Sequence, residues 1–282
     1  MFSIVTAVYN QLPMNRLFRE SLVRYTDSPF ELLIIDNGST DGSDEYFAEN
    51  GATVIRNGGN YSYPWCQNRG ADAAGGTVLC FFNNDIIVGP HWDSRVRAVM
   101  EAHQCTMVSC CATDRCESDD ATRRSQRRWK YIRNPLQMLL GSRYRSLQLM
   151  HALMYGNWER WCETRHTRFG TAVSEGIAGS NVIMTRSALD TVGRWDERIQ
   201  AADFDLMIRS KLRSINYGDI KPVHLIHGVY MHHFIRLTAK KKYPPFTDGK
   251  NLIGLNDKWD PDTVNPLLAS SGMRIKRKAP RD

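Results

Sequence analysis

Residues 31–43 read ELLIIDNGSTDGS, and this run sets the architecture of the chain. Its first half, from Glu31 to Asp36, is a mostly apolar segment closed by an aspartate. Such a run is typical of a strand buried on both faces of a sheet. Its second half is rich in Gly, Ser and Asp, which are residues that form tight turns. The pattern therefore predicts a buried strand that delivers the carboxylate of Asp36 to the edge of a sheet.

Similar patterns recur on both sides of this run. Residues 2–8 form a β-rich segment, and residues 77–82 form another apolar strand that ends in Asn83-Asn84-Asp85. The alternation is completed by helical patterns and short strands at 13–25, 41–50, 53–55, 65–74, 91–103 and 106–111. Alternating strands and helices predict an α/β fold with a mainly parallel central sheet flanked by helices. Such sheets bind ligands beyond the carboxyl ends of their strands.

The composition is that of an ordinary globular protein. The chain has 282 residues, of which 42% are hydrophobic and 24% charged, so disorder and coiled coil are excluded as the main plan. No apolar run approaches the roughly 20 residues that span a bilayer, and no secretory signal is visible, so a cytoplasmic location is expected. The seven cysteines include no Cys-x-x-Cys pair, and we expect them to be reduced and mostly buried.

The positive charge is concentrated in residues 115–168. This segment holds 12 arginine and lysine residues against five acidic residues, an excess equal to the net charge of +7 of the whole chain. Apolar residues recur at steps of three and four from Leu136 to Met154, which predicts an amphipathic helix. This bias favours a polyanionic partner, which could be a phosphorylated substrate, an anionic membrane surface or a nucleic acid. A solvated helical face without a partner is the alternative.

Acidic and histidine side chains stand where this architecture places its sites. Asp36 and Asp85 follow buried strands, and Asp203 opens a helix over 203–215, with Asp205 two residues further on. A single aspartate of this kind is often only a turn former or a helix cap, but three of them in one α/β frame indicate a site. This helix is followed by a strand-like stretch with four histidines, His224, His227, His232 and His233.

Three segments of the first half carry a specific resemblance. They are SIVTAVYN at residues 3–10, LIIDNGSTDGS at 33–43 and FFNND at 81–85. Their sequence and spacing resemble a family 2 glycosyltransferase of the GT-A fold. In that family the last of the three segments corresponds to an Asp-x-Asp motif.

The second half adds to the resemblance. Residues 176–184 (GIAGSNVIM) resemble the acceptor-side strand of the family, and residues 193–198 (GRWDER) resemble its Gly-x-Phe-Asp-Glu segment. Residues 202–206 (ADFDL) resemble its Glu-Asp-x-Asp-Leu motif. The resemblance covers residues 1–111 and 172–235 and is interrupted by the basic segment.

The resemblance implies a nucleotide-sugar site in the first part of the chain. Asp36 matches the carboxylate that hydrogen-bonds the pyrimidine base. Residues 60–70 resemble a loop that lies along the donor, although the arginine of that loop is replaced by Gln67. The residues implied to bind the donor are Thr6, Val8, Asn10, Asp36, Asn68, Asn83 and Asn84.

The resemblance also implies a divalent cation, Mn²⁺ or Mg²⁺, held against the donor diphosphate. A hard cation of this kind neutralises the leaving phosphate charge and takes few protein ligands, because the phosphates supply the rest. Asp85 keeps the full carboxylate of the motif, so it is expected to be the acidic ligand. A histidine in a late strand often completes the metal site in this family, and His232 matches it best, with His233 as second choice.

Asp203 matches the general base of the family, which takes the proton from the acceptor hydroxyl. Its predicted place at a helix N-terminus favours the ionised carboxylate by roughly 0.3–1 kcal/mol. An N-cap role for the same side chain is compatible with this assignment. Asp205, half a helical turn away, is expected to face elsewhere.

The implied organisation is a GT-A domain over residues 1–245 and a C-terminal extension over 246–282. Within the domain, residues 1–111 bind the nucleotide sugar, residues 115–170 form a helical basic insertion, and residues 172–235 form the acceptor and catalytic part. On the acceptor side, the resemblance points to Gly179, Ser180 and Trp195.

The expected function is metal-dependent, inverting transfer of a sugar from a nucleoside diphosphate donor, first of all a UDP-sugar, to a saccharide or lipid-linked hydroxyl. The basic segment leaves two alternatives open: peripheral contact with the anionic cytoplasmic face of a membrane, and a nucleic-acid acceptor. A non-catalytic carbohydrate or nucleic-acid binding module is a further alternative, because Gln67 and Asn83-Asn84 depart from the family pattern. A nucleotidyltransferase would need a Lys- or Arg-bearing Gly-rich loop after the first strand, and Gln11-Leu12-Pro13 is not one.

Overall fold

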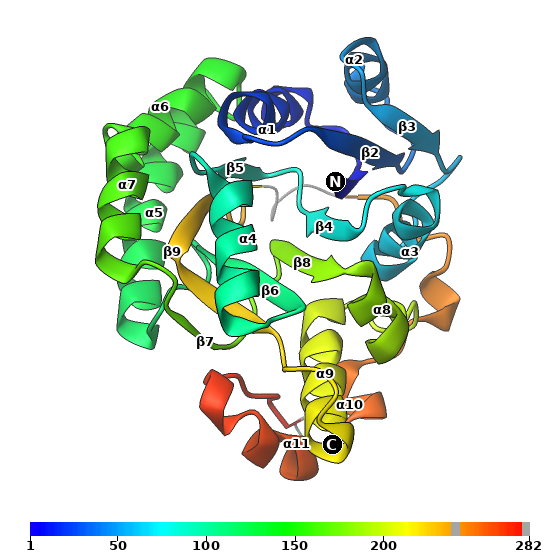
Figure 1. The fold of residues 1–282 in the computed structure, drawn as a ribbon. Helices are drawn as coiled ribbons and strands as arrows, with labels where there is room; N and C mark the ends of the chain where they lie inside the picture. The colour runs from blue at the N-terminus through cyan, green and yellow to red at the C-terminus, as the bar shows by residue number, and fades with distance from the viewer. Residues whose placement is uncertain (238–242, 278–282) are drawn as a thin grey trace.

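The computed structural model describes residues 1–237 and 243–277, which form a nine-stranded sheet with helices on both faces (Figure 1). The strands are β1 (Phe2–Val8), β2 (Phe30–Asp36), β3 (Thr53–Arg56), β4 (Val78–Phe82), β5 (Ile86–Val88), β6 (Met107–Ala112), β7 (Val173–Glu175), β8 (Asn181–Thr185) and β9 (His224–His233). The α-helices are α1 (Leu12–Tyr25), α2 (Ser43–Glu49), α3 (Tyr63–Ala73), α4 (Trp92–His103), α5 (Asp119–Leu140), α6 (Tyr144–Tyr155), α7 (Trp158–Phe169), α8 (Arg186–Val192), α9 (Ala202–Tyr217), α10 (Leu255–Lys258) and α11 (Pro261–Leu267).

The strand directions bring several carboxyl ends to one edge of the sheet. The order is β3-β2-β1-β4-β8-β6-β9-β5, with β7 paired to β9. Strands β1 to β4 are mutually parallel, and β8 is antiparallel to both β4 and β6. Because β6 and β9 are parallel, the carboxyl ends of β1, β2, β4 and β9 point the same way. The predicted α/β fold with a central sheet flanked by helices is confirmed, and the sheet is mixed, with four parallel and four antiparallel strand pairs among the described residues. Sheets of this kind bind ligands at the carboxyl edge of their parallel strands.

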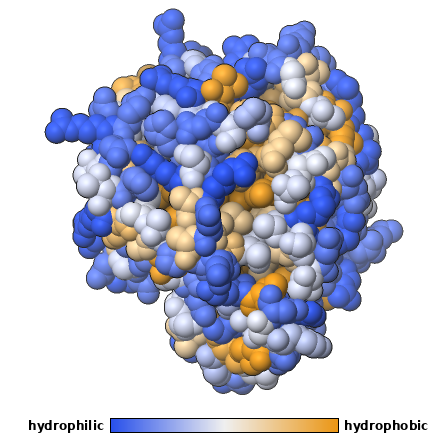
Figure 2. All heavy atoms as spheres, viewed as in Figure 1, coloured by the Kyte–Doolittle hydropathy of each residue, from blue (hydrophilic) through white to orange (hydrophobic). Residues whose placement is uncertain are grey.

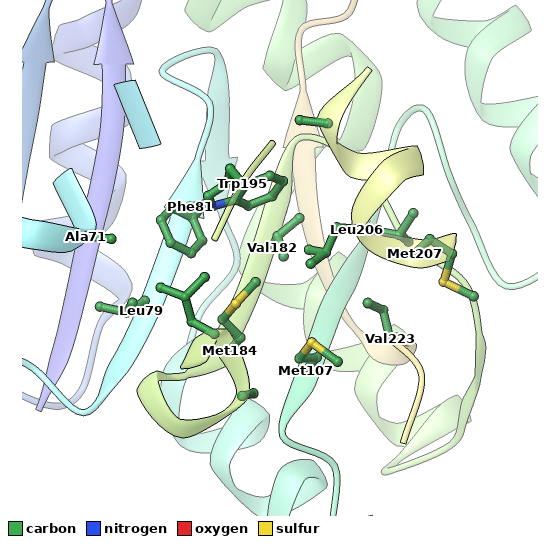
Figure 3. Packing of buried hydrophobic residues seen from close by; sticks show 14 of the residues in the cluster. Ala71, Leu79, Phe81, Met107, Val182, Met184, Trp195, Leu206, Met207 and Val223 are labelled. Atoms are coloured by element: carbon green, nitrogen blue, oxygen red, sulfur yellow. The ribbon is translucent and has the colours of Figure 1, made fainter. Parts of the chain in front are cut away.

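The central strands are buried on both faces, as their continuous apolar runs predict. In β1, Ile4 packs in one hydrophobic cluster with residues of α1 and α4, whereas Val5 packs in a second cluster with residues of α3, α8 and α9. Successive side chains of a strand point to opposite faces, so a two-sided sheet needs apolar residues at every position. Figure 3 shows the second cluster, in which Phe81 and Trp195 lie against each other beside Val182 and Leu206.

The basic segment folds as three helices beside β9 (Figure 1). The apolar periodicity from Leu136 to Met154 predicts one continuous helix, and that prediction is wrong. Helix α5 ends at Leu140, and Gly141 adopts a φ of +68° that ends it before α6 begins. Glycine tolerates this left-handed backbone, so the helix break is encoded locally although the apolar spacing runs through it.

The C-terminal part packs against the same core as the sheet. Val264 and Leu268, in and just after α11, are buried in the cluster that also contains Leu206 of α9. The expected domain boundary near 245 and the extension to 282 include residues 238–242 and 278–282, which lie outside the described residues. The described part of the extension therefore supports α9 rather than standing apart from the domain.

Two composition-based expectations can be compared with the structure. All seven cysteines are unpaired and buried, which confirms that expectation. Within the described residues, no helix combines the length and the apolar character needed to cross a membrane. On the face shown in Figure 2, hydrophilic side chains predominate and the hydrophobic areas between them are separate.

Candidate active site

The carboxylate of Asp36 organises the loop that follows β2. The β1–β2 register pairs Val8 with Asp36, so both residues reach the carboxyl edge of the sheet together. Asp36 is 2% exposed, and its Oδ2 accepts hydrogen bonds from the backbone N–H groups of Gly38 (3.0 Å) and Ser39 (3.1 Å). The turn residues of the 31–43 run thus fold around the carboxylate and fix its position.

The end of β1 contributes the neighbouring polar groups. Asn10 has a φ of +57°, and its backbone N–H donates to Oγ of Ser39 at 2.8 Å, which ties the loop after β1 to the loop after β2. Thr6 is fully buried, and its hydroxyl makes no hydrogen bond within the described residues. The predicted donor residues Thr6 and Val8 on β1, Asn10 in the loop after it and Asp36 at the end of β2 therefore lie together at this edge of the sheet.

A buried asparagine that the sequence did not single out connects three parts of this edge. The side chain of Asn15, fully buried in α1, donates to the backbone oxygen of Asn10 (3.0 Å) and to Oγ of Ser43 (2.8 Å). Its oxygen accepts a hydrogen bond from Nδ2 of Asn84 (2.7 Å). Asn15 thereby joins the end of β1, the start of α2 and the loop after β4.

Two α3 residues have different surroundings. Nδ2 of Asn68 donates to the backbone oxygen of Trp195 (2.9 Å) and to Oε1 of Glu197 (2.8 Å), and its oxygen accepts from the Trp195 N–H. These contacts engage its amide group in holding the segment 193–198. Gln67, which stands in place of the family arginine, is fully buried, and neither of its side-chain polar atoms has a partner in the described structure.

The loop after β4 delivers Asp85 to the end of β9. Strand β5 begins at the next residue, and its register pairs Ile86 with His233. Oδ1 of Asp85 is buried and makes no hydrogen bond within residues 1–237 and 243–277, and Nε2 of His233 lies 3.3 Å from it as an ion-pair partner. On its other side, Nδ1 of His233 lies 2.8 Å from Oδ1 of Asp114. Burial disfavours the protonated imidazole, but the two carboxylates prevail and raise the pKa of His233 well above its usual value.

His232 lies in a different environment from its neighbour. Its Nδ1 is 2.8 Å from Nδ1 of His151 on α6, and its ring packs edge-on against Trp129 of α5. Complete burial lowers the pKa of His232 well below its usual value, so the ring is neutral. Of the two histidines considered as metal ligands, the structure places the second choice, His233, beside Asp85. The first choice, His232, packs against the helices.

Asp203 occupies the first turn of α9 and keeps some exposed surface. A Cβ atom added to Gly179 would come within 2.3 Å of its Oδ2, so the backbone of the acceptor-side segment passes directly beside the carboxylate. Burial raises the pKa of Asp203; the backbone N–H of Phe204 opposes this, and the charge of Asp114 adds to it. The buried hydroxyl of Tyr63 has no hydrogen-bond partner among the described residues, and its own pKa is raised by burial and by the charge of Asp203.

Asp205, two residues further on, is a structural group. It is fully buried, and its Oδ2 accepts a hydrogen bond from Nε of Arg209 at 2.7 Å. Its Oδ1 accepts from Nε1 of Trp259 (2.8 Å) and lies 2.6 Å from Nζ of Lys258. Asp205 thus ties the C-terminal part to α9 and faces away from Asp203, as its spacing predicts.

The acceptor-side candidates line the junction of β4, β8 and α9. The backbone oxygen of Ser180 accepts a hydrogen bond from the N–H of Asn83 at 2.9 Å, which links the acceptor-side segment to the loop that carries Asp85. Trp195 is 3% exposed and packs edge-on against Phe81 (Figure 3), while its indole N–H has no partner in the described structure. Trp195 is therefore largely a core residue.

The segment after residue 242 reaches the donor loops, which the sequence did not indicate. Asn60 accepts a hydrogen bond on its backbone oxygen from the Thr247 N–H (2.6 Å), and its Nδ2 donates to the backbone oxygen of Pro244 (2.7 Å). The ring of Tyr243 lies 5.7 Å from that of Tyr9. The loop over 57–62 is therefore covered from the C-terminal side.

Residues 3–193 match the sequence profile of glycosyl transferase family 2. The chain belongs to this family. The match includes the donor loops, Asp85, Gly179 and the basic helices, and it ends ten residues before Asp203. No curated protein matches the sequence.

Solved structures with a similar fold are glycosyltransferases. A structure of GalNAc-T7 with UDP, GalNAc and Mn²⁺ aligns with a TM-score of 0.55 at 15% identity, over 88% of this chain and 45% of that one. The mannosyltransferase PcManGT from Pyrobaculum calidifontis, with GDP-Man and Mn²⁺, gives 0.47 at 16% identity over 79% and 56%. S. aureus TarS, residues 1–349, gives 0.49 at 12% identity over 81% and 59%. The chain thus spans about half the length of these structures, and the first alignment shows the GT-A fold.

The residues at the carboxyl edge of this family 2 glycosyltransferase fit a divalent cation. Asp85 offers a buried carboxylate oxygen whose partner within the described residues is Nε2 of His233. A cation bound between these two atoms would take the place of the Nε2 proton, while Nδ1 keeps its contact with Asp114. An oxygen and an imidazole nitrogen form a donor set that Mn²⁺ accepts. The described residues contain no cluster of three or more His, Cys, Asp and Glu that could hold a metal ion by itself. Further ligands would therefore come from a donor diphosphate.

Proposed function

We propose that this family 2 glycosyltransferase is a metal-dependent, inverting enzyme. It transfers a sugar from a nucleoside diphosphate donor to a hydroxyl of a saccharide or lipid-linked acceptor. Asp203 is the general base, and Asp85 and His233 hold Mn²⁺ or Mg²⁺. The neighbouring structures that contain UDP or GDP-Man together with Mn²⁺ agree with this class of donor and cofactor.

The observation that carries the proposal is the state of Asp203. Its carboxylate lies against the glycine of the acceptor-side segment, and no side-chain ion pair is formed by it within the described residues. Burial raises its pKa, and a general base works best when its pKa approaches the pH at which the enzyme operates. Asp205 cannot act as a general base in the same way, because its two oxygens are already engaged by three partners.

The chemistry then follows from the placement of these groups. The acceptor oxygen forms a bond to the anomeric carbon while the bond from that carbon to the diphosphate oxygen breaks. The hydroxyl proton moves to an oxygen of Asp203, and the electron pair leaves with the nucleoside diphosphate. The bound cation would neutralise the charge that develops on the leaving group. Because the acceptor attacks opposite the leaving group, the anomeric configuration is inverted.

We propose a UDP-sugar as the donor, on the basis of the loop around Asp36. The carboxylate is fixed by two backbone N–H groups at the end of β2, beside the unpaired hydroxyl of Thr6. A fixed carboxylate is an acceptor for the imide N–H of a uracil base, whereas cytosine presents no donor at that ring position. The segment that contains Thr247 closes the same end of the site.

The test is release of nucleoside diphosphate from a panel of nucleotide sugars, with and without Mn²⁺. We expect slow, metal-dependent hydrolysis of one donor, lost in Asp85→Ala and strongly reduced in Asp203→Asn. Asp190→Asn, on the exposed face of α8, is the matched control and should retain full activity. If the enzyme hydrolyses no donor without an acceptor, metal-dependent binding of UDP, measured by calorimetry, still tests the proposal. Failure of every nucleoside diphosphate to bind would overturn the proposal.

The same experiment separates the alternatives. A non-catalytic binding module would bind a ligand without turnover, and its affinity would not depend on Asp203. A nucleic-acid acceptor is favoured by the charge of residues 115–168, and transfer to an oligonucleotide would decrease steeply with salt concentration.

A further inference from the structure

The turn between α5 and α6 exposes a group of large apolar side chains. Met138, Leu139 and Leu140 at the end of α5 are 81%, 74% and 45% exposed, and Leu149 and Leu153 on α6 are also exposed. A surface hollow of about 710 Å³ connects Leu139, Leu140 and Leu149. Single exposed leucines are common on protein surfaces, but consecutive ones indicate an interaction site. We call this group the apolar tip.

The charge around the apolar tip has one sign. Residues 121–158 contain eight arginine and lysine residues and no aspartate or glutamate. Arg143 and Arg145 line the same hollow as the exposed leucines. The nearest carboxylate contact from another helix is that of Glu20 in α1, which accepts a hydrogen bond from the hydroxyl of Tyr144. The tip therefore combines apolar side chains with a positive field that its own helices do not neutralise.

The contacts of α5 show where the apolar tip lies relative to the active site. From its start to its end, α5 contacts successive residues along and beyond β9. The Ser125 hydroxyl lies 3.2 Å from that of Tyr230, Nη1 of Arg133 donates to the oxygen of Ile235 (2.8 Å), and Nε2 of Gln137 donates to that of Leu237 (2.7 Å). Helix α5 thus runs toward the carboxyl end of β9, so its last residues lie on the same side of the sheet as Asp85 and His233.

We propose that the apolar tip docks on an anionic lipid bilayer. Met138, Leu139 and Leu140 enter the boundary between headgroups and acyl chains, and the arginines of α5 and α6 contact lipid phosphates. The exposed apolar side chains and the positive charge both contribute, because interfacial binding strength grows with buried apolar area and with attraction to anionic lipid. The docking itself does not depend on the proposed function. If that function holds, the bilayer would lie near the edge of the sheet that carries Asp85 and His233.

Two other occupants fit the tip less well. A second copy of the chain would bring two segments of the same positive charge together, which opposes association. A nucleic acid would be attracted by the arginines, but its phosphate backbone would not bury three consecutive exposed apolar side chains. An anionic bilayer is complementary to both the charge and the apolar surface.

Vesicle co-sedimentation of the full chain tests the proposal. We expect binding to vesicles with about 30 mol% phosphatidylglycerol in phosphatidylcholine and much weaker binding to pure phosphatidylcholine. Binding should decrease in about 0.5 M NaCl, because the Debye length falls to a few ångströms. The double variant Met138→Ser/Leu139→Ser should reduce the partition coefficient by at least about tenfold. Its control, Val23→Ser/Ile215→Ser, changes two apolar residues on α1 and α9 that are also more than half exposed and should bind normally.

A charge variant tests the second half of the proposal. Arg143→Glu/Arg145→Glu should also abolish binding to the anionic vesicles, whereas Lys250→Glu/Arg274→Glu, with the same change in net charge on the C-terminal part, should retain it. Circular dichroism checks that each variant is folded. Failure of the native chain to bind either vesicle, or unchanged binding by the tip variants, would overturn the proposal. Binding of an oligonucleotide with no binding to vesicles would replace it with the nucleic-acid alternative.

Discussion

The start of α9 and the end of β9 each present the same type of side chain twice. In α9 the pair is Asp203 and Asp205, and in β9 it is His232 and His233. In each pair one member is packed among other residues, and the other lies beside the groups of the candidate site. Side chains two residues apart on a helix point in nearly opposite directions, and so do side chains of adjacent residues on a strand. The surroundings of each side chain, rather than its residue type or its number of partners, therefore separate the packed member from the one at the candidate site.

The two regions differ in how the packed member is held. Asp205 is charged, and its cost of burial is offset by Arg209, Lys258 and the indole of Trp259. His232 instead avoids that cost, because burial keeps its ring neutral among aromatic neighbours. The buried carboxylate of Asp205 is thus held by cations, whereas the buried imidazole of His232 is accommodated as the neutral ring.

The largest expected effect is on turnover at Asp203. Asp203→Asn removes the proton acceptor while it preserves shape, so turnover should fall by about 10²–10⁴-fold. Binding of UDP with Mn²⁺ should be unchanged, because Asp85 and His233 are intact. Steady-state kinetics and calorimetry on the same preparation measure both quantities. Turnover within a few-fold of the native enzyme would remove Asp203 from the proposed role.

The second effect is on stability at Asp205. Asp205→Ala removes a fully buried carboxylate from the partly buried Arg209 and Lys258, of which Lys258 keeps Asp196 as a partner. The loss should lower the free energy of unfolding by about 3 kcal/mol, the lower end of the range for breaking a buried ion pair. Urea denaturation followed by tryptophan fluorescence measures the change. The control Asp190→Ala, on the exposed face of α8, should cost far less. Equal stability of the two variants would mean that the partners of Asp205 do not depend on it.

The third effect separates the two histidines. His233→Ala should weaken Mn²⁺-dependent binding of UDP by at least about tenfold, the order seen when groups that support a metal are removed. His232→Ala should leave that binding nearly unchanged and lower thermal stability instead, because its ring fills space beside Trp129 and His151. Calorimetric titration of both variants with UDP and Mn²⁺ checks this. Weaker binding by His232→Ala than by His233→Ala would contradict the comparison.

The smallest effect is a pH dependence of stability. The pKa of Asp203 is raised in the folded protein, so the folded state holds this proton more tightly than the unfolded state does. This contribution to stability is therefore lost as the pH rises through the ordinary carboxyl value toward the raised one. Asp203→Asn, which cannot ionise, should melt at a higher temperature than the native chain at neutral pH. The difference should shrink below about pH 4, where the native carboxyl is protonated in both states. Melting curves from pH 3 to about pH 7.5 cover this window.

Much of the fold could be predicted because apolar runs and turn residues act locally. The strand that ends at Asp36 and the helix that begins near Asp203 are both close to their predicted positions. The strand β5 was missed, since its three residues, Ile86–Val88, are too few to show a pattern. The break at Gly141 was missed because the apolar spacing on either side of it is in phase.

The site was only partly predictable, since several assignments depend on pairing between distant strands. The sequence placed His232 and His233 side by side, but only the register of β5 against β9 puts His233 next to Asp85. Asp114, which contacts His233, belongs to no motif and follows β6 in a short turn. Asn68 matched a donor loop in sequence, yet its amide is engaged by Trp195 and Glu197. Contacts of this kind are set by the tertiary fold.

The hydrogen bonds of Asn15 have a consequence for how this site can evolve. One buried amide joins the loop that follows β1, the first residue of α2 and the loop that carries Asp85. A shorter or differently shaped side chain there would remove a hydrogen bond from all three segments at once, and of the three partner groups the Ser43 hydroxyl would still donate to Asp41. Few substitutions should therefore survive at position 15, and those that do should be accompanied by changes at Ser43 or Asn84. The shape of this edge would then change by coordinated steps through a fully buried residue.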